Sequence, residues 1–139
     1  MARIRGKDTK PELAVRQLLH GMGYRFRLHR RDLPGRPDLS FPSRRKAIYV
    51  HGCFWHHHAG CALGHMPATR PEYWAEKFSR NRVRDARNLS EIRALSWEAL
   101  IVWECEVTRP AALAERLTGF LGAPGRAIHE PGAPTDLDS

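Results

Sequence analysis

A nine-residue segment from Cys53 to Cys61 constrains this chain more than any other part of its sequence. The segment holds two cysteines and three histidines, and a third cysteine, Cys105, follows 44 residues later. Three cysteines cannot all pair with one another, and cysteines beside histidines in a reducing compartment are typical zinc ligands. We therefore predict a closed tetrahedral zinc site of three cysteines and one histidine that stabilises the fold. The alternative is a histidine-rich loop with incidental cysteines, and spacing leaves the histidine ligand open among His56, His57 and His58.

The chain is strongly basic outside its C-terminal end. Its 139 residues include 23 Lys and Arg against 15 Asp and Glu, which gives a net charge of +8. Residues 126–139 carry −2, so the first 125 residues carry +10. A field of this sign attracts a polyanion, either nucleic acid or an anionic membrane. No apolar run approaches the ~18 residues of a membrane span and no signal peptide is visible, so we expect a cytoplasmic protein without a membrane partner.

The first predicted helix begins near Thr9 and ends at Gly21 to Gly23. Thr9, Pro11 and Glu12 form a helix-start signature with a capping box. In such a box Glu12 has a structural explanation as the reciprocal partner of Thr9, which competes with any catalytic role. The apolar face of this helix is expected to consist of Leu13, Leu18, Leu19 and Met22.

Short strands and two more helices are expected to follow. Alternation over residues 24–29 predicts a half-buried strand with Tyr24, Phe26 and Leu28 facing inward. The other expected elements are strands over 38–41, 47–50 and 99–103 and helices over 72–95 and 109–121. This order predicts one α/β domain over residues 1–122, with a mixed sheet flanked by helices, and a loose tail over residues 123–139.

Four segments together resemble the very-short-patch repair endonucleases. In chain order they are LPGRPD from Leu33 to Asp38, HGCFWH from His51 to His56, Asn81 with Arg84-Asp85, and LIVWEC from Leu100 to Cys105. The resemblance covers nearly the whole expected domain. It implies a restriction-endonuclease-like fold and a monomeric enzyme that nicks double-stranded DNA 5′ to the thymine of a T:G mismatch left by deamination of 5-methylcytosine. It also implies that the enzyme acts on DNA of the bacterial nucleoid and that other repair proteins act after the nick.

The resemblance implies Mg²⁺-dependent hydrolysis of a phosphodiester bond. Asp38 would bind Mg²⁺ through its carboxylate and Val50 through its main-chain carbonyl, while Glu12 would hold a metal-bound water. Independently of the family, Mg²⁺ prefers oxygen ligands and keeps several waters, so one carboxylate and one carbonyl suffice beside a phosphate. An Asp at the start of a strand also often caps a turn, so Asp38 gains weight from its place between the LPGRP loop and the histidines.

Histidines provide the proton chemistry that the resemblance implies. His56 would activate the attacking water with help from Asp85, and His51 would lie against the scissile phosphate and the leaving oxygen. An imidazole with a pKa of about 6.5 suits proton transfer near neutrality. A restriction-type nuclease usually carries Glu-x-Lys on this strand, whereas here the strand ends Tyr49-Val50-His51. Without the resemblance, Asp85 would be interpreted as part of a solvated helix face.

The remaining implied roles concern zinc and DNA. The zinc ligands would be Cys53, His58, Cys61 and Cys105, and the wedges that enter the base stack beside the mismatch would be Phe54, Trp55 and Trp74. Two adjacent large aromatic residues on a rigid metal loop can hardly both be buried, and apolar wedges between base steps can kink DNA. Trp97 and Trp103 are expected in the core.

Two other functions remain compatible with the sequence. The first is a zinc-containing double-strand DNA endonuclease of the same clan that acts through a dimer. The second is a zinc-containing DNA-binding module without catalysis, which would leave Asp38, His56 and Asp85 without a shared purpose. Separating nicked from linear plasmid distinguishes the first from a nickase, and Mg²⁺-dependent cleavage would exclude the second.

Overall fold

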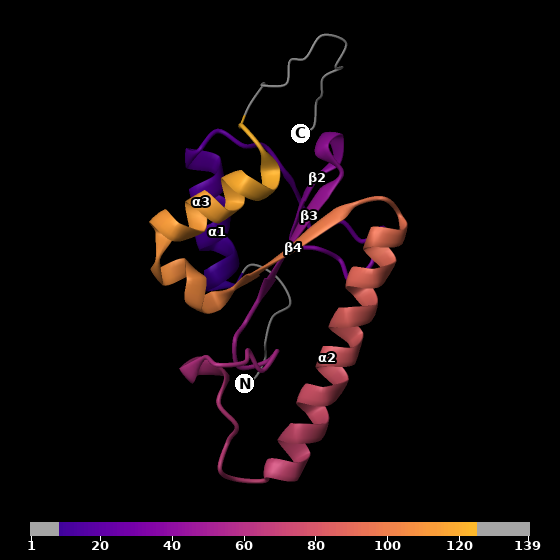
Figure 1. The fold of residues 1–139 in the computed structure, drawn as a ribbon, viewed down its shortest axis with the longest axis vertical. Helices are drawn as coiled ribbons and strands as arrows, with labels where there is room; N and C mark the ends of the chain where they lie inside the picture. Colours follow the sequence, from indigo (N-terminus) through magenta and orange to yellow (C-terminus); the bar gives the residue numbers. More distant parts are fainter. Residues whose placement is uncertain (1–8, 125–139) are drawn as a thin grey trace.

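A four-stranded sheet covered by helices on both faces forms the body of the molecule (Figure 1). The computed structural model describes residues 9–124, so residues 1–8 and most of the expected C-terminal tail lie outside the described residues. Helices α1 (Lys10–Gly21) and α3 (Pro110–Leu121) lie on one face of the sheet, and α2 (Pro71–Ala94) lies on the other. Within residues 9–124, no helix has both the length and the apolar character needed to cross a membrane.

The sheet is mixed, which confirms the predicted α/β architecture. Strands β1 (Arg27–Leu28), β2 (Leu39–Phe41) and β3 (Lys46–His51) pair antiparallel, and β4 (Glu98–Trp103) pairs parallel with β3. Parallel neighbours need a long crossover, which here contains α2. Because β3 and β4 are paired up to their last residues, the segments that leave them start side by side. The restriction-endonuclease-like character of this sheet stays a prediction.

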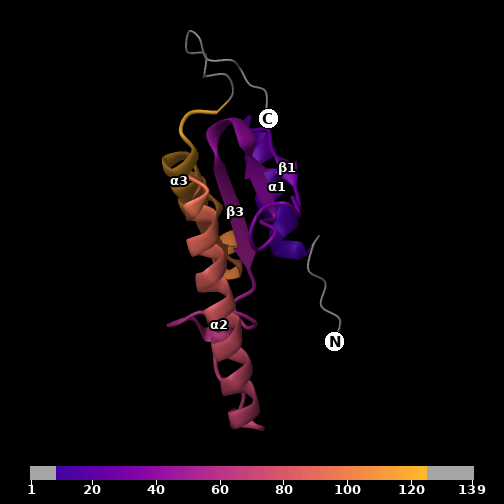
Figure 2. The same cartoon turned by 90° about the vertical axis from the view of Figure 1, so that its right-hand side faces the viewer.

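Two hydrophobic clusters fix the helices to the sheet. The larger one lies beneath α1 and α3 and includes the fully buried Val15, Leu19, Leu39, Ile48 and Leu117. The smaller one lies beneath the C-terminal half of α2 and consists of Leu33, Ala47, Tyr49 and Ile92. The N-terminal half of α2 extends past the end of β3, and residues 52–70 lie beside it (Figure 2). This extension gives the Cys- and His-rich segment a helix to pack against.

The first helix has the predicted bounds but a different buried face. The Glu12 N–H donates to Thr9 Oγ1 at 3.4 Å, as the capping signature predicts. The buried positions are Glu12, Val15 and Leu19, spaced three and four residues apart. Leu13, expected on the apolar face, is 42% exposed, so that expectation is wrong. The first buried position of α1 is therefore occupied by the carboxylate of Glu12.

The strand expected over residues 24–29 is reduced to two residues. Leu28 is 41% exposed instead of facing inward. β1 is an edge strand that pairs only with β2, and His29 leaves it with a φ of 49°. The pairing is therefore too short for alternation to persist. Tyr24 is nevertheless buried, and its hydroxyl donates to the Gly122 carbonyl.

Candidate active site and metal centre

The four predicted zinc ligands converge beyond the ends of β3 and β4. Cys53 and Cys105 stand at equivalent positions, two residues past the last paired residues of the two strands. The intervening loop brings back His58 and Cys61. Nδ1 of His58 lies 3.6 Å from Sγ of Cys53 and 3.6 Å from Sγ of Cys105. The four donor atoms all lie within 4.8 Å of one another.

This donor set fits a tetrahedral zinc ion. Zn–S bonds of about 2.3 Å and Zn–N bonds of about 2.0–2.1 Å place sulfur and nitrogen about 3.5 Å apart across a tetrahedral edge, close to the observed 3.6 Å. Burial raises the pKa of the Cys53 thiol to about 12 and also raises the pKa of Cys105. Neighbouring thiols with raised pKa values ionise poorly, so a bound cation is what would hold them as thiolates.

Main-chain contacts shape the loop around these donors. The Cys53 N–H donates to Glu104 Oε1 at 3.1 Å, and the Gly64 N–H donates to the Cys61 carbonyl at 2.9 Å. A Cβ on Gly64 would lie 2.6 Å from the main-chain oxygen of His58. Only glycine fits here, because the Cβ atom of any other residue would clash with the His58 main chain. The loop therefore closes tightly behind the histidine donor.

A histidine–aspartate pair lies between the loop and α2. Nδ1 of His56 is 2.6 Å from Oδ2 of Asp85. This contact assigns the Nδ1 proton to a hydrogen bond with Asp85 and leaves Nε2 as the basic nitrogen. Burial by itself raises the pKa of Asp85, but the hydrogen bond and charge of His56 hold it below its ordinary value. Asp85 therefore stays ionised and orients His56.

His51, the last residue of β3, stacks on His56. The two ring centroids are 3.7 Å apart and the planes differ by 7°. Nδ1 of His51 lies 3.9 Å from Oδ2 of Asp85 and has no hydrogen-bond partner within residues 9–124. Burial lowers the pKa of His51 to about 3, and the charge of His56 adds to this effect. His51 is therefore a neutral imidazole at physiological pH.

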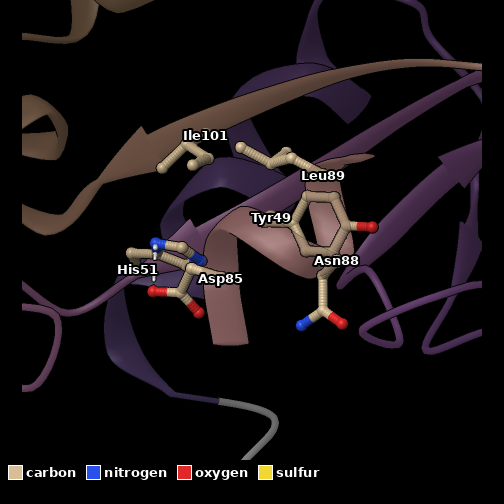
Figure 3. A pocket seen from close by; sticks show the side chains of 6 residues that line it. All are labelled: Tyr49, His51, Asp85, Asn88, Leu89 and Ile101. Atoms are coloured by element: carbon tan, nitrogen blue, oxygen red, sulfur yellow. Dashed lines mark ion pairs between the residues drawn. The ribbon is translucent and has the colours of Figure 1, made fainter. Parts of the chain in front are cut away.

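The stacked geometry favours proton transfer over chelation by this pair. A metal ion binds an imidazole nitrogen close to the ring plane, and two parallel rings 3.7 Å apart cannot both point that way at one ion. His51 and Asp85 form one end of a small pocket between the sheet and α2, and Tyr49 and Asn88 lie toward the other (Figure 3). The polar end of this pocket is thus built for hydrogen bonding.

A second group of donors lies on the α1 side of β3. Oε2 of Glu12, a residue only 1% exposed, accepts hydrogen bonds from Arg16 Nη2 at 2.6 Å and, at 2.7 Å, contacts Nε2 of His29. Oδ2 of Asp38 accepts from the Val50 N–H at 2.7 Å. Donor atoms of Glu12, His29 and Asp38 lie within 4.8 Å of one another. The predicted role of the Val50 carbonyl stays a prediction, because the contact seen here uses its N–H.

The electrostatics of Asp38 suit a cation. Burial raises the pKa of Asp38 to about 7, the Val50 N–H works against this rise, and the nearby Glu12 carboxyl adds to it. Two oxygen donors from different elements thus lie close together in a partly desolvated place. Hard cations such as Mg²⁺ prefer such oxygen ligands. The donor set therefore fits a magnesium ion.

Alternation along β3 brings the carboxylates and the histidines together. Val50 faces the core beneath α1 and α3, whereas His51 faces α2. Asp38 and Glu12 accordingly meet β3 from one side, and Asp85 and His56 meet it from the other. The predicted catalytic residues are thus gathered at the end of one strand, although their chemical roles stay predictions.

The three predicted wedges form one half-buried aromatic cluster. The ring of Phe54 lies 5.0 Å from Trp55, 5.3 Å from Trp74 and 5.4 Å from the buried Phe78. The Asn81 side-chain amide donates to the Trp55 carbonyl at 2.7 Å. Neither Phe54 nor Trp55 is fully buried, as expected of adjacent aromatic residues on a tight loop. α2 thus braces the aromatic cluster.

Sequence reasoning placed one site residue wrongly and missed another. Trp103, expected in the core, is half-buried and stacks on His58 with ring centroids 4.0 Å apart and planes 4° apart. Its edge also meets His51 at 5.3 Å, so it joins the two sites. His29 appeared only as a polar position of a strand. Its contact with Glu12 depends on tertiary structure, and its positive φ leaves no clear mark in the sequence.

Comparisons with known proteins agree on one family. The family model described as DNA mismatch endonuclease Vsr matches residues 1–62. The type II nicking enzyme V.XorIIP of Xanthomonas oryzae pv. oryzae is 52% identical over 121 residues, which cover 87% of this chain and 88% of that enzyme. The DNA mismatch endonuclease Vsr of Escherichia coli is 44% identical over 130 residues, 90% of this chain and 83% of that protein. The type II nicking enzyme V.NmeAIP of Neisseria meningitidis is 37% identical over 117 residues, 84% of this chain and 83% of that enzyme.

Proposed function

Because the chain belongs to the Vsr family of DNA mismatch endonucleases, we propose that it nicks double-stranded DNA 5′ to the thymine of a T:G mismatch. Such mismatches arise by deamination of 5-methylcytosine. The observation that carries the proposal is the meeting of two carboxylates, the buried Glu12 and the half-buried Asp38, with a histidine–aspartate pair at the end of β3. The reaction is hydrolysis of one phosphodiester bond by a monomer, and downstream repair proteins act on the nick.

Asp38 and the main-chain carbonyl of Val50 would hold Mg²⁺ in this proposal, and Glu12 would hold a water bound to the ion. Their support is the oxygen donor set and the raised pKa of Asp38, which indicates a carboxylate placed where a counter-ion is favourable. Bound Mg²⁺ supplies stabilisation of the negative charge that develops on the phosphate and the leaving oxygen. Asp38 and Glu12 would thereby favour a cation beside the scissile phosphate.

His56 acts as the general base. Its Nε2 takes a proton from the attacking water, while Nδ1 stays bonded to Asp85. Asp85 fixes the ring and stabilises the imidazolium that forms, as an ionised partner does in other histidine-based sites. His51, neutral because of burial, donates a hydrogen bond to the phosphate or the leaving oxygen without adding a charge.

The zinc ion of this proposal is structural. Four protein donors close its coordination sphere, so no position is left for substrate. Zinc ties the loop after β3 to the segment after β4 and thereby fixes both the His56 backbone and the aromatic cluster of Phe54, Trp55 and Trp74. These three side chains enter the base stack beside the mismatch.

A plasmid with a single T:G mismatch tests the proposed reaction. We expect Mg²⁺ to convert the supercoiled plasmid to the nicked form, with the cut mapped 5′ to the thymine, and omission of Mg²⁺ to prevent it. Mg²⁺ is omitted instead of chelated, so that zinc stays in place. Linear product would favour a double-strand endonuclease that acts through a dimer. Binding without any cut would favour a non-catalytic DNA-binding module.

A further inference from the structure

His29 contacts the Glu12 carboxylate through its side chain and the Asp38 main chain through its backbone. Its imidazole Nε2 lies 2.7 Å from Oε2 of Glu12. Its main-chain N–H donates to the Asp38 carbonyl at 3.1 Å. Side chain and backbone of one residue therefore connect the carboxylate of α1 with the residue that precedes β2. His29 is thus a partner of the Glu12 carboxylate that comes from outside α1.

The buried environment makes this connection important. Glu12 is 1% exposed, and a buried carboxylate is stable only where donors satisfy it. Arg16 lies one turn further along the same helix as Glu12. His29 comes from a different segment, and its backbone is bonded to Asp38. The His29 side chain therefore links the position of the Glu12 carboxylate to the segment that carries Asp38.

The backbone conformation of His29 marks the end of β1. Its φ of 49° lies in the left-handed region, which costs most L-residues on the order of 1 kcal/mol. Asparagine adopts this region readily, as histidine does. A substitution by asparagine therefore changes the side chain with little effect on the backbone.

We propose that His29 is a positioning residue of the cation site, which holds Glu12 at a fixed place beside Asp38 and thereby raises the affinity for a divalent cation. The inference rests on the proposed function, since it assumes that Asp38 binds the ion and that Glu12 holds a water bound to it. His29 acts through Glu12 and does not touch the ion. Partners that orient ligands in this way typically contribute about 10- to 100-fold in metal affinity or activity.

Binding of Mn²⁺ to the zinc-loaded, DNA-free full-length protein tests this directly. Free Mn²⁺ is measured by electron paramagnetic resonance during titration. We expect His29→Ala to weaken Mn²⁺ binding by about 10- to 100-fold. His29→Gln keeps an N–H donor of similar reach and should bind Mn²⁺ nearly as the parent does. His20→Ala, which removes an exposed histidine of α1, is the matched control and should change nothing.

A further variant, His29→Asn, separates the role of the side chain from that of the backbone. His29→Asn accepts the left-handed conformation but is too short to reach Glu12, so it should fold and yet bind Mn²⁺ as weakly as the alanine variant. Parent-like Mn²⁺ affinity in His29→Asn would overturn the positioning role. A nitrogen coupling in the Mn²⁺ spectrum of the parent, absent in His29→Gln, would also overturn it, because His29 would then be a ligand.

Asp38→Ala distinguishes failure of this inference from failure of the proposed cation site. If Asp38→Ala abolishes Mn²⁺ binding while both His29→Ala and His29→Asn bind as the parent does, only the positioning role is wrong. If Asp38→Ala binds Mn²⁺ as the parent does, the proposed cation site itself is misplaced, and the inference fails with it.

Discussion

The two groups of potential metal donors in this molecule differ in how far other protein groups satisfy their donor atoms. The sulfur-rich group consists of Cys53, His58, Cys61 and Cys105, and its donor atoms mainly face one another. The oxygen-rich group of Glu12 and Asp38 is already satisfied by protein donors, namely Arg16, His29 and the Val50 N–H. The oxygen-rich group is therefore satisfied by protein donors alone, whereas we expect the sulfur-rich group to depend on the proposed zinc ion.

We therefore expect a structural role for one group and a chemical role for the other. The proposed zinc ion would add folding free energy to a loop that is also shaped by its main-chain hydrogen bonds and by the aromatic contacts with α2. The oxygen-rich group is held between α1 and β2, both anchored in the larger hydrophobic cluster. We expect the fold to persist without the proposed Mg²⁺. Variants in the two groups should therefore have opposite effects on stability and activity.

Cys105→Ser should have the largest effect. Removing one thiolate opens the zinc site and should lower the free energy of unfolding by several kcal/mol, since apparent zinc binding in small zinc domains contributes about 10–16 kcal/mol to folding. Thermal denaturation with zinc analysis of the purified protein measures both quantities. We expect about one zinc per chain in the parent and a marked loss in the variant. A variant as stable as the parent, or a parent without zinc, would show that this loop folds by other means.

Asp38→Ala should abolish nicking while the fold persists. Burial already disfavours the ionised form of this carboxyl, so its removal should leave the thermal stability near that of the parent. DNA affinity should largely remain, because phosphate contacts with the basic surface supply most of it. Mg²⁺-dependent nicking, melting temperature and DNA binding are measured together. Unfolding of this variant would contradict the expectation that the fold does not depend on the oxygen-rich group.

His56→Ala should slow single-turnover nicking by about 10²- to 10⁴-fold, the usual contribution of a positioned acid or base. His57→Ala is the matched control, because His57 stacks on Phe78 and lies outside the His56–Asp85 pair. Both variants keep the four zinc donors, so both should retain zinc. Equal rates for the two variants would mean that the general base lies elsewhere.

Trp55→Ala tests the part of the zinc loop that faces DNA. Loss of one stacking side chain should lower cleavage of a T:G duplex by about 5- to 150-fold, which corresponds to 1–3 kcal/mol per stacked base. General DNA affinity should fall much less, since it depends on charge. Rates and affinities are compared at one salt concentration. A parallel fall of both quantities would assign Trp55 to binding and not to mismatch discrimination.

The acidity of Asp38 predicts a pH-dependent demand for Mg²⁺. With a metal-free pKa of about 7, Asp38 holds a proton below neutrality that the cation must displace. The Mg²⁺ concentration for half-maximal nicking should therefore rise as pH falls below about 7, by up to about tenfold per pH unit, and level off above it. Titrations of Mg²⁺ between pH 5.5 and 8.5 measure this. A demand for Mg²⁺ independent of pH would contradict the assignment.

Patterns that lie close together in the sequence gave the most reliable expectations. The helices and the mixed sheet follow from periodicity and capping. The structure also brings together the four predicted zinc donors, but only the family resemblance selects His58 among the three histidines, and Cys105 lies 44 residues beyond Cys61. The pairing of His56 with Asp85 was available only through the family resemblance, because the residues lie 29 positions apart on a loop and a charged helix.

Other features depend on tertiary contacts that no local pattern encodes. Glu12 matches a capping signature, yet its carboxylate is held by Arg16 and by His29 from another element. Trp103 is a large apolar residue of the kind expected in a core, but it ends a strand and stacks on His58. Leu28 alternates correctly, but an edge strand of two residues gives it no partner to bury against.

Single-turnover nicking of paired T:G and T:A oligonucleotide duplexes tests mismatch repair most directly. A T:G wobble pair is weaker than a Watson–Crick pair, so opening the stack beside it is easier by on the order of a kcal/mol. With the thymine strand labelled and Mg²⁺ present, we predict that the parent cuts T:G faster than T:A by at least about tenfold, only 5′ to the thymine. Equal cutting of both duplexes would contradict a mismatch-specific enzyme and identify a general endonuclease.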